Sequence, residues 1–134
     1  MSFFEWTDDL SLGVSNIDDQ HKQIVAAMNL LHEKNEKNAS KDELLASFQE
    51  LGAITVKHFA DEEKFMDSFE FTDVKVHKII HKQLLDKFGA HLAEFEAGDG
   101  AVSDAVFQFL NNWLRAHICG IDKKYAEESK EKSA

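Results

Sequence analysis

The 134-residue sequence contains no proline and only one cysteine, Cys119. Because proline is the strongest breaker of a helix interior, its absence permits long, uninterrupted helices throughout the chain. A lone cysteine cannot form an intrachain disulfide, and this suits a reducing compartment. We therefore expect a protein of the cytoplasm.

Long apolar runs are also missing from the sequence. No stretch approaches the roughly 20 apolar residues that a membrane-spanning helix requires. The first residues are acidic and aromatic, whereas an export signal begins with basic residues and continues with an apolar run. We expect a soluble protein with no membrane as a partner.

Positive charge is scarce as well. The chain has 15 Lys and Arg against 25 Asp and Glu, which gives a formal net charge of −10. Binding to phosphate groups depends on clustered Lys and Arg, so this balance argues against nucleic acid as a partner. The length is that of one ordinary domain with its own hydrophobic core, and we expect a monomer.

Apolar residues recur at the 3-and-4 spacing of a helix in every part of the chain except its ends. Ser40 and Glu43 form a capping box at one helix start, Ser103 is a candidate N-cap at another, and "GDG" at 98–100 is the signal for a helix end. The pattern predicts four helices, over residues 18–37, 41–69, 73–97 and 103–125.

Short connections between the predicted helices make consecutive helices antiparallel neighbours. The sequence therefore predicts an all-α fold, an up-down-up-down antiparallel four-helix bundle in one domain, 1–134. We expect residues 1–16 to form a non-helical N-terminal arm that docks aromatic side chains on the bundle, 17–126 to form the bundle, and 127–134 to be a polar, frayed tail.

Polar residues occupy inward positions in all four predicted helices. They are five of the seven histidines and one glutamate: His21, His58, Glu62, His77, His81 and His117. With a rise of about 1.5 Å per residue, an up-down-up-down bundle brings all six to the same end. Burying so many polar groups is costly unless each finds a hydrogen-bond or metal partner.

Asp122 joins this set only if the helix is irregular. It follows His117 by five residues, which is about 140° round a regular α-helix. A π-type turn, with its i to i+5 relation, would direct both side chains inward, and such turns are frequent at functional sites. We therefore predict a π-type turn over 117–122.

Five imidazoles and two carboxylates exceed what one four-coordinate metal needs, so the donor count favours two metals bridged by the carboxylates. If Glu62, Asp122 and one oxygen atom bridge both ions, an ion with three histidines reaches about six ligands and an ion with two reaches about five. One coordination position then stays open on one ion, as reversible capture of a small diatomic molecule requires.

These residues resemble the hemerythrin family, in particular its single-domain bacterial members, over nearly the whole chain. Trp6 in the arm and Trp113 ahead of the last inward histidine also match. The matching motifs are "NIDDQHK" at 16–22, "HFADEE" at 58–63, "HKIIH" at 77–81 and "HICGID" at 117–122.

The resemblance implies two iron ions with a bridging oxo or hydroxo group and dioxygen as a reversible ligand, for storage, delivery or sensing without enzymatic activity. By the same resemblance, Glu62 and Asp122 bridge the ions, and dioxygen binds at the iron that has two histidines. The remaining implied iron ligands are His77, His81 and His117 on one ion, and His21 and His58 on the other. The implied oxygen pocket is lined by Ile24, Phe59, Trp113 and Leu114. Cys119 departs from the family pattern, which has an aliphatic residue there, near the pocket.

Other functions stay open at this stage. One is a redox enzyme on the same di-iron site, peroxidase-like or handling nitric oxide; others are an iron store of the ferritin kind and a site for other divalent metals. Ferritin-like sites are rich in Glu, whereas this set has five imidazoles and two carboxylates. No further Asp, Glu or Lys lies at the pocket positions to donate a proton, which disfavours the enzyme. A redox or delivery partner is not identified by the sequence.

Several neighbouring residues receive ordinary structural interpretations. We expect His32 and His91 at the surface or edge, Glu63 in solvent and Cys119 as a packing residue. Gln20 and Tyr125 are candidates for hydrogen bonds near the site. The predicted plain core residues are Phe48, Phe65, Phe69, Phe88 and Phe95.

Overall fold

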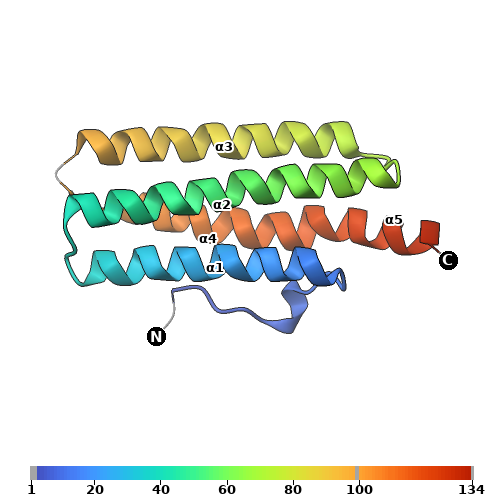
Figure 1. Ribbon diagram of the computed structural model, residues 1–134, viewed down its shortest axis with the longest axis horizontal. Helices are drawn as coiled ribbons and strands as arrows, with labels where there is room; N and C mark the ends of the chain where they lie inside the picture. The colour runs from blue at the N-terminus through green and yellow to red at the C-terminus, as the bar shows by residue number, and fades with distance from the viewer. Residues whose placement is uncertain (1–2, 99, 134) are drawn as a thin grey trace.

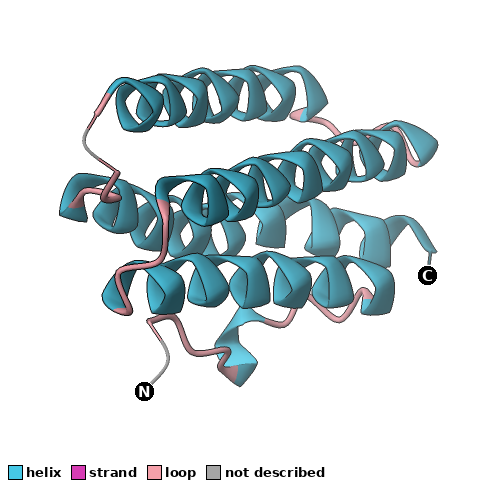
Figure 2. Cartoon of the chain, turned by 60° about the vertical axis from the view of Figure 1, so that its left-hand side comes forward, coloured by secondary structure: helices cyan, strands magenta, loops and turns pink. Residues whose placement is uncertain are grey.

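The computed structural model describes residues 3–98 and 100–133, and it is an antiparallel four-helix bundle. Figure 1 shows the long rods side by side, and Figure 2 shows only helices and loops along the described chain. The predicted all-α bundle is confirmed. Its rods are α1 (Ser15–Glu36), α2 (Lys41–Ser68), α3 (Val74–Ala97) and a composite of α4 (Asp104–Ala116), the π-helical segment η2 (His117–Asp122) and α5 (Lys123–Ser133).

The N-terminal arm packs along α1, as Figure 1 shows. It contains one 3₁₀ turn, η1 (Asp8–Leu10), and α1 already begins at Ser15. The expectation that residues 1–16 are non-helical is therefore corrected at this turn and at residues 15–16. Asn29 of α1 holds the arm by a pair of hydrogen bonds: its Oδ1 accepts from the Phe4 N–H at 2.8 Å, and its Nδ2 donates to the Phe4 carbonyl at 2.9 Å. Phe4 is consequently buried, which confirms that an arm aromatic docks on the bundle.

Side chains from neighbouring elements secure the helix ends. The Ser40 hydroxyl accepts from the Glu43 N–H at 3.2 Å, as the capping box predicts. Lys41 Nζ donates to the carbonyl oxygens of Glu96 and Gly98 at 2.6 and 3.0 Å, and so ties the end of α3 to the start of α2. Ser103 occupies the N-cap position of α4 without a side-chain capping bond.

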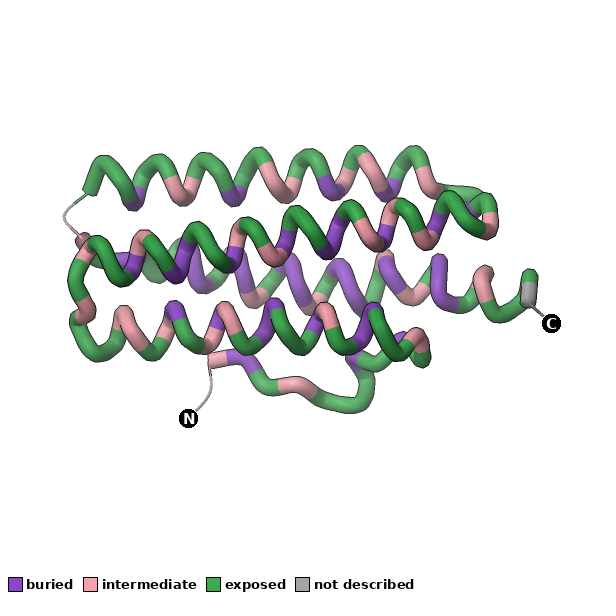
Figure 3. The backbone as a smooth tube through the Cα atoms, in the orientation of Figure 1, coloured by how far each residue is buried: buried purple, intermediate pink, exposed green. Residues whose placement is uncertain are grey.

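The buried side chains form one stripe along each rod, and Figure 3 shows these stripes facing the bundle axis. Phe48, Phe88 and Phe95 lie in the core, with the rings of Phe48 and Phe88 packed edge to face at 5.1 Å. Phe65 and Phe69 are only half-buried and pack against each other at the rim of the core, so their expected place in the plain core is corrected.

The C-terminal residues are helical through Ser133, whereas the sequence suggested a frayed tail. Tyr125 and Ala126 bury one face of α5. The Glu128 carboxylate accepts from the Thr72 N–H at 2.9 Å, and Lys132 Nζ donates to the carbonyls of Phe69 and Glu70, each at 3.0 Å. These bonds to the α2–α3 connection order a segment that composition alone marks as solvent-facing.

None of the described helices combines the length and the apolar character that crossing a bilayer requires. Residues 1–2 of the predicted arm, Asp99 of the predicted helix-end signal and Ala134 of the predicted tail lie outside the described residues.

α2 and α3 approach each other closely at Gly52, and a larger side chain there should destabilise the protein. A Cβ on Gly52 would lie 2.8 Å from Cε1 of the buried Phe88, whereas a Cβ on Gly89 would meet nothing within 4 Å. Overpacking costs about 1–3 kcal/mol, and replacing glycine by alanine within a helix contributes about 1 kcal/mol of stability. Gly52→Ala should therefore lower the free energy of unfolding, and Gly89→Ala should raise it, both measured by urea denaturation. Equal stabilisation by the two substitutions would contradict the close packing at Gly52.

Candidate metal centre

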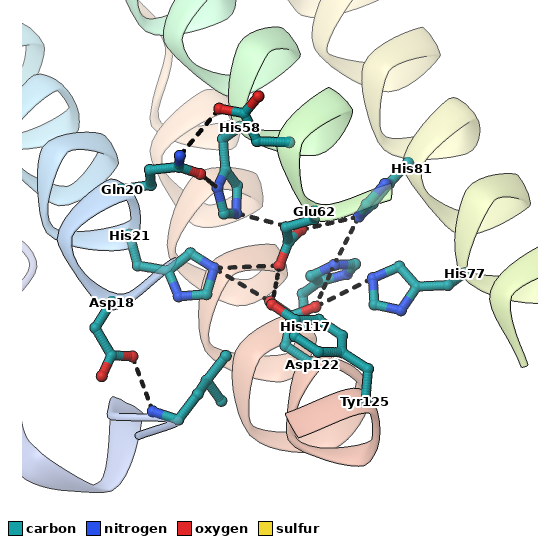
Figure 4. Close-up of polar contacts among 12 residues, drawn as sticks. Asp18, Gln20, His21, His58, Glu62, His77, His81, His117, Asp122 and Tyr125 are labelled. Atoms are coloured by element: carbon teal, nitrogen blue, oxygen red, sulfur yellow. Dashed lines mark hydrogen bonds and ion pairs between the residues drawn. The ribbon is translucent and has the colours of Figure 1, made fainter. Parts of the chain in front are cut away.

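Every rod contributes to one buried cluster of polar side chains, which Figure 4 shows pointing toward one another. α1 supplies one histidine, α2 a histidine and a glutamate, α3 two histidines, and η2 a histidine and an aspartate. Each of the seven is at most 2% exposed. The structure therefore brings together all seven predicted residues: His21, His58, Glu62, His77, His81, His117 and Asp122.

The predicted π-type turn is present as η2, which spans His117–Asp122. In a regular α-helix these two residues would lie about 140° apart, but the i to i+5 relation of the π-helix places both inward. Cys119 and Gly120, which lie between them, face outward and are exposed. The expectations that Cys119 packs in the interior and lies near the oxygen pocket are therefore corrected.

The Asp122 carboxylate accepts contacts from three rods. Its Oδ1 lies 3.1 Å from His77 Nε2 and 3.0 Å from His117 Nε2. Its Oδ2 lies 3.2 Å from His21 Nε2. The two oxygens of one carboxylate thus face two different groups of histidines.

Glu62 divides its contacts in a similar way. Its Oε1 lies 3.2 Å from both His58 Nε2 and His81 Nε2, and its Oε2 lies 3.7 Å from His21 Nε2. The Tyr125 hydroxyl donates a hydrogen bond to Oε2. The predicted neighbour Tyr125 therefore does contact the cluster, and it orients Glu62.

The donor atoms form two overlapping groups, and within each group all the atoms lie within 4.8 Å of one another. Glu62 and Asp122 belong to both groups. One group adds three histidines, His77, His81 and His117; the other adds two, His21 and His58.

The unpaired atoms of the cluster test whether metal ions fit. Both oxygens of Asp122, Glu62 Oε1, and the Nε2 atoms of His58 and His77 are buried and have no hydrogen-bond partner among the described residues. The Nε2 atoms of His81 and His117 face each other at 3.3 Å. Buried polar atoms are otherwise nearly always paired, so these lone pairs are arranged as ligands are around a cation.

The charges in the cluster support the same conclusion. Burial raises the pKa of Glu62, but its electrostatic interaction with His58 and its contacts with His21 and His81 hold that pKa well below its usual range. Burial and the nearby Glu62 charge raise the pKa of Asp122, yet the opposing contacts with His117 and His21 bring it down to about 2. Burial lowers the pKa of His21, but Asp122 and Glu62 together raise it to about 9. The cluster thus presents two anionic carboxylates that attract positive charge.

Two residues outside the cluster hold the far side of a histidine ring. Gln20 Oε1 accepts from His58 Nδ1 at 2.7 Å, and Gln20 was a candidate from the sequence. Glu63 Oε2 accepts from His81 Nδ1 at 3.0 Å, which corrects the expectation that Glu63 is simply solvated. The sequence carries no signal for the Glu63 contact, because it depends on how closely α2 packs against α3.

The predicted pocket residues Ile24, Phe59, Trp113 and Leu114 are all buried. The Phe59 ring stacks on His81 with a centroid distance of 3.8 Å and contacts Trp113 edge to face at 5.7 Å. The half-buried His32 and His91 pack instead against Phe3 and Phe109, away from the cluster, as expected.

A four-helix bundle that buries five imidazoles around two shared carboxylates defines a class of metal-binding proteins. The family model "Hemerythrin HHE cation binding domain" matches residues 12–128 of the chain. The chain therefore belongs to the hemerythrin family.

Individual relatives agree with this membership. A bacteriohemerythrin of Stenotrophomonas maltophilia is 32% identical over 97% of this chain and 84% of its own length. A hemerythrin-like protein of Naegleria gruberi is 34% identical over 91% of this chain and 90% of its own. A crystal structure of a hemerythrin mutant superposes with a TM-score of 0.87 at 29% identity, covering 95% of this chain and 97% of that one.

The unpaired buried atoms predict that metal stabilises the fold. An ion that binds only the folded chain contributes about 4 kcal/mol at a thousandfold excess over its dissociation constant, which corresponds to a rise of roughly 10 °C or more in Tm for a chain of this size. Chelation should lower Tm by that amount, as measured by calorimetry, and readdition of metal should restore it. Asp122→Ala should abolish the response, and a Tm indifferent to metal in the unmodified chain would contradict the assignment.

Proposed function

We propose that the chain holds two iron ions at these seven residues and binds dioxygen reversibly. The observation that carries the proposal is the inequality of the two donor groups, which share Glu62 and Asp122 but have three and two histidines. With equal bridging, the group with fewer histidines is one ligand short of the other, and that position is available to a small molecule.

Each side chain has a definite role in this proposal. Glu62 and Asp122 would be shared by both ions, because each already lies near histidines of both groups. His77, His81 and His117 hold one ion, and His21 and His58 hold the other. When bound, iron supplies the electrons with which dioxygen is held and released.

Four apolar side chains, those of Ile24, Phe59, Trp113 and Leu114, are proposed to line the oxygen pocket. Their burial keeps water and its protons from the site. Phe59 extends along the cluster, since its ring contacts those of His58, His81 and His117. These side chains carry no acid or base, and this favours a carrier over a redox enzyme, the second function that the sequence allows. Similarity to relatives named bacteriohemerythrin and hemerythrin-like protein also supports the proposed oxygen carrier.

Metal content tests the ligand assignment. Protein purified without chelators should contain about two irons per chain, because the two donor groups each suit one ion. His58→Ala should lower this number, since it removes one of only two histidines from a group, whereas His91→Ala should leave it unchanged. Elemental analysis of the three proteins decides the matter. One zinc per chain, or equal metal loss in both variants, would overturn the assignment.

The visible spectrum tests the reversible binding of dioxygen. The reduced, iron-loaded protein should gain colour in air and lose it on degassing through repeated cycles, because no proton donor lies among the pocket residues to drive further reaction. Stopped-flow or steady-state absorption measures this. One-way oxidation on the first exposure would support the redox enzyme in place of the carrier.

A further inference from the structure

The histidine rings of the cluster are not all held in the same way. Of the five Nδ1 atoms, those of His21, His77 and His117 are buried, and residues 3–98 and 100–133 offer them no hydrogen-bond partner. His58 and His81 are the exceptions, and each belongs to a different donor group. Each group therefore has one histidine that is oriented from its far side.

A chain of hydrogen bonds determines the state of His58. Gln20 Nε2 donates to the Asp61 carboxylate at 3.0 Å, and since a carboxylate only accepts, this bond fixes which end of the amide is the nitrogen. The amide oxygen consequently faces His58 Nδ1, 2.7 Å away, and accepts its proton. His58 Nε2 is thereby left with its lone pair toward Glu62.

Glu63 orients His81 in the same way, by accepting the proton of Nδ1, but its acceptor is a charged carboxylate. Its Oε2 accepts from His81 Nδ1 at 3.0 Å, and the side chain is 30% exposed, so the carboxylate keeps contact with water. Nε2 of His81 then faces the cluster as a lone pair. A carboxylate behind an imidazole makes that imidazole a more basic ligand than a neutral amide does.

We propose that Glu63 and Gln20 are positioning residues that give the two donor groups unequal strength. The anionic Glu63 strengthens His81 in the three-histidine group and favours the higher oxidation state of the ion held there. The neutral Gln20, anchored by Asp61, orients His58 in the two-histidine group and adds no charge. This inference rests on the proposed pair of ions.

Three variants separate charge from orientation. Glu63→Gln keeps an acceptor and removes the charge, whereas Glu63→Ala removes both. The double variant Gln20→Glu with Asp61→Asn moves a negative charge from Asp61 to the His58 side, and the asparagine amide can still donate to the new carboxylate. Glu94→Gln is the control for loss of one negative charge, because Glu94 is exposed on α3 and its side chain makes no polar contact within the described part of the chain.

The experiment combines an anaerobic titration of metal-free protein with Fe(II) and a measurement of the midpoint reduction potential of the loaded protein. The affinity for one of the two Fe(II) ions should fall about tenfold or more in Glu63→Ala, because removing a hydrogen-bond partner of a metal-binding histidine typically has an effect of this size. The loss of affinity should be smaller in Glu63→Gln. The potential should rise in Glu63→Gln, fall in the double variant and stay unchanged in Glu94→Gln.

The outcomes are distinct. A wild-type chain that binds no pair of ions defeats the proposed function itself. Two ions bound normally, with potentials that are unmoved or that shift in the same direction in Glu63→Gln and the double variant, would overturn the roles of Glu63 and Gln20 alone. Should Glu63→Ala fail to fold, Glu63→Gln still decides, because it preserves the hydrogen-bond acceptor.

Discussion

The burial of five imidazoles and two carboxylates at one level of a helical bundle is the constraint on which the remainder of the structure depends. If these groups had no partners, the free-energy cost of burying them would exceed the modest net stability of a domain of this size. A cation placed among these groups would offset this cost. It requires anionic carboxylates and imidazole lone pairs directed at a common volume, and the cluster provides both. The atoms whose burial alone would destabilise the fold are therefore the ones arranged to bind a cation.

The helices of the bundle fix the positions of the cluster side chains. The cluster residues of α1, α2 and α3 lie on regular helices, where the position of each side chain follows from that of its neighbours. The fourth rod supplies two cluster residues five positions apart, and it does so by a π-helical segment rather than by a loop. Interactions beyond the cluster add orientation: Tyr125 holds Glu62, Gln20 holds His58, and Glu63 holds His81. The site is thus supported by several elements at once.

An asymmetry runs through the whole arrangement. The two donor groups differ in their number of histidines, and their outer partners differ in charge. Phe59 and Trp113 pack against rings of the three-histidine group, with a stacking distance of 3.8 Å between Phe59 and His81. The two donor groups therefore differ in their number of histidines, in the charge behind them and in the aromatic rings packed against them.

Much of this follows from the sequence. Apolar residues spaced by three and four predicted the helices of the bundle, and the histidine and carboxylate positions on those helices predicted the common level of the cluster. The five-residue spacing of His117 and Asp122 predicted the π-turn, because spacing along a helix is a local property of the chain. Contacts between rods were decided only by tertiary structure. Glu63 reaches His81, Phe65 remains at the rim, and the polar tail becomes helical against the α2–α3 connection. These outcomes depend on the distance and rotation between packed helices, which no spacing within one helix determines.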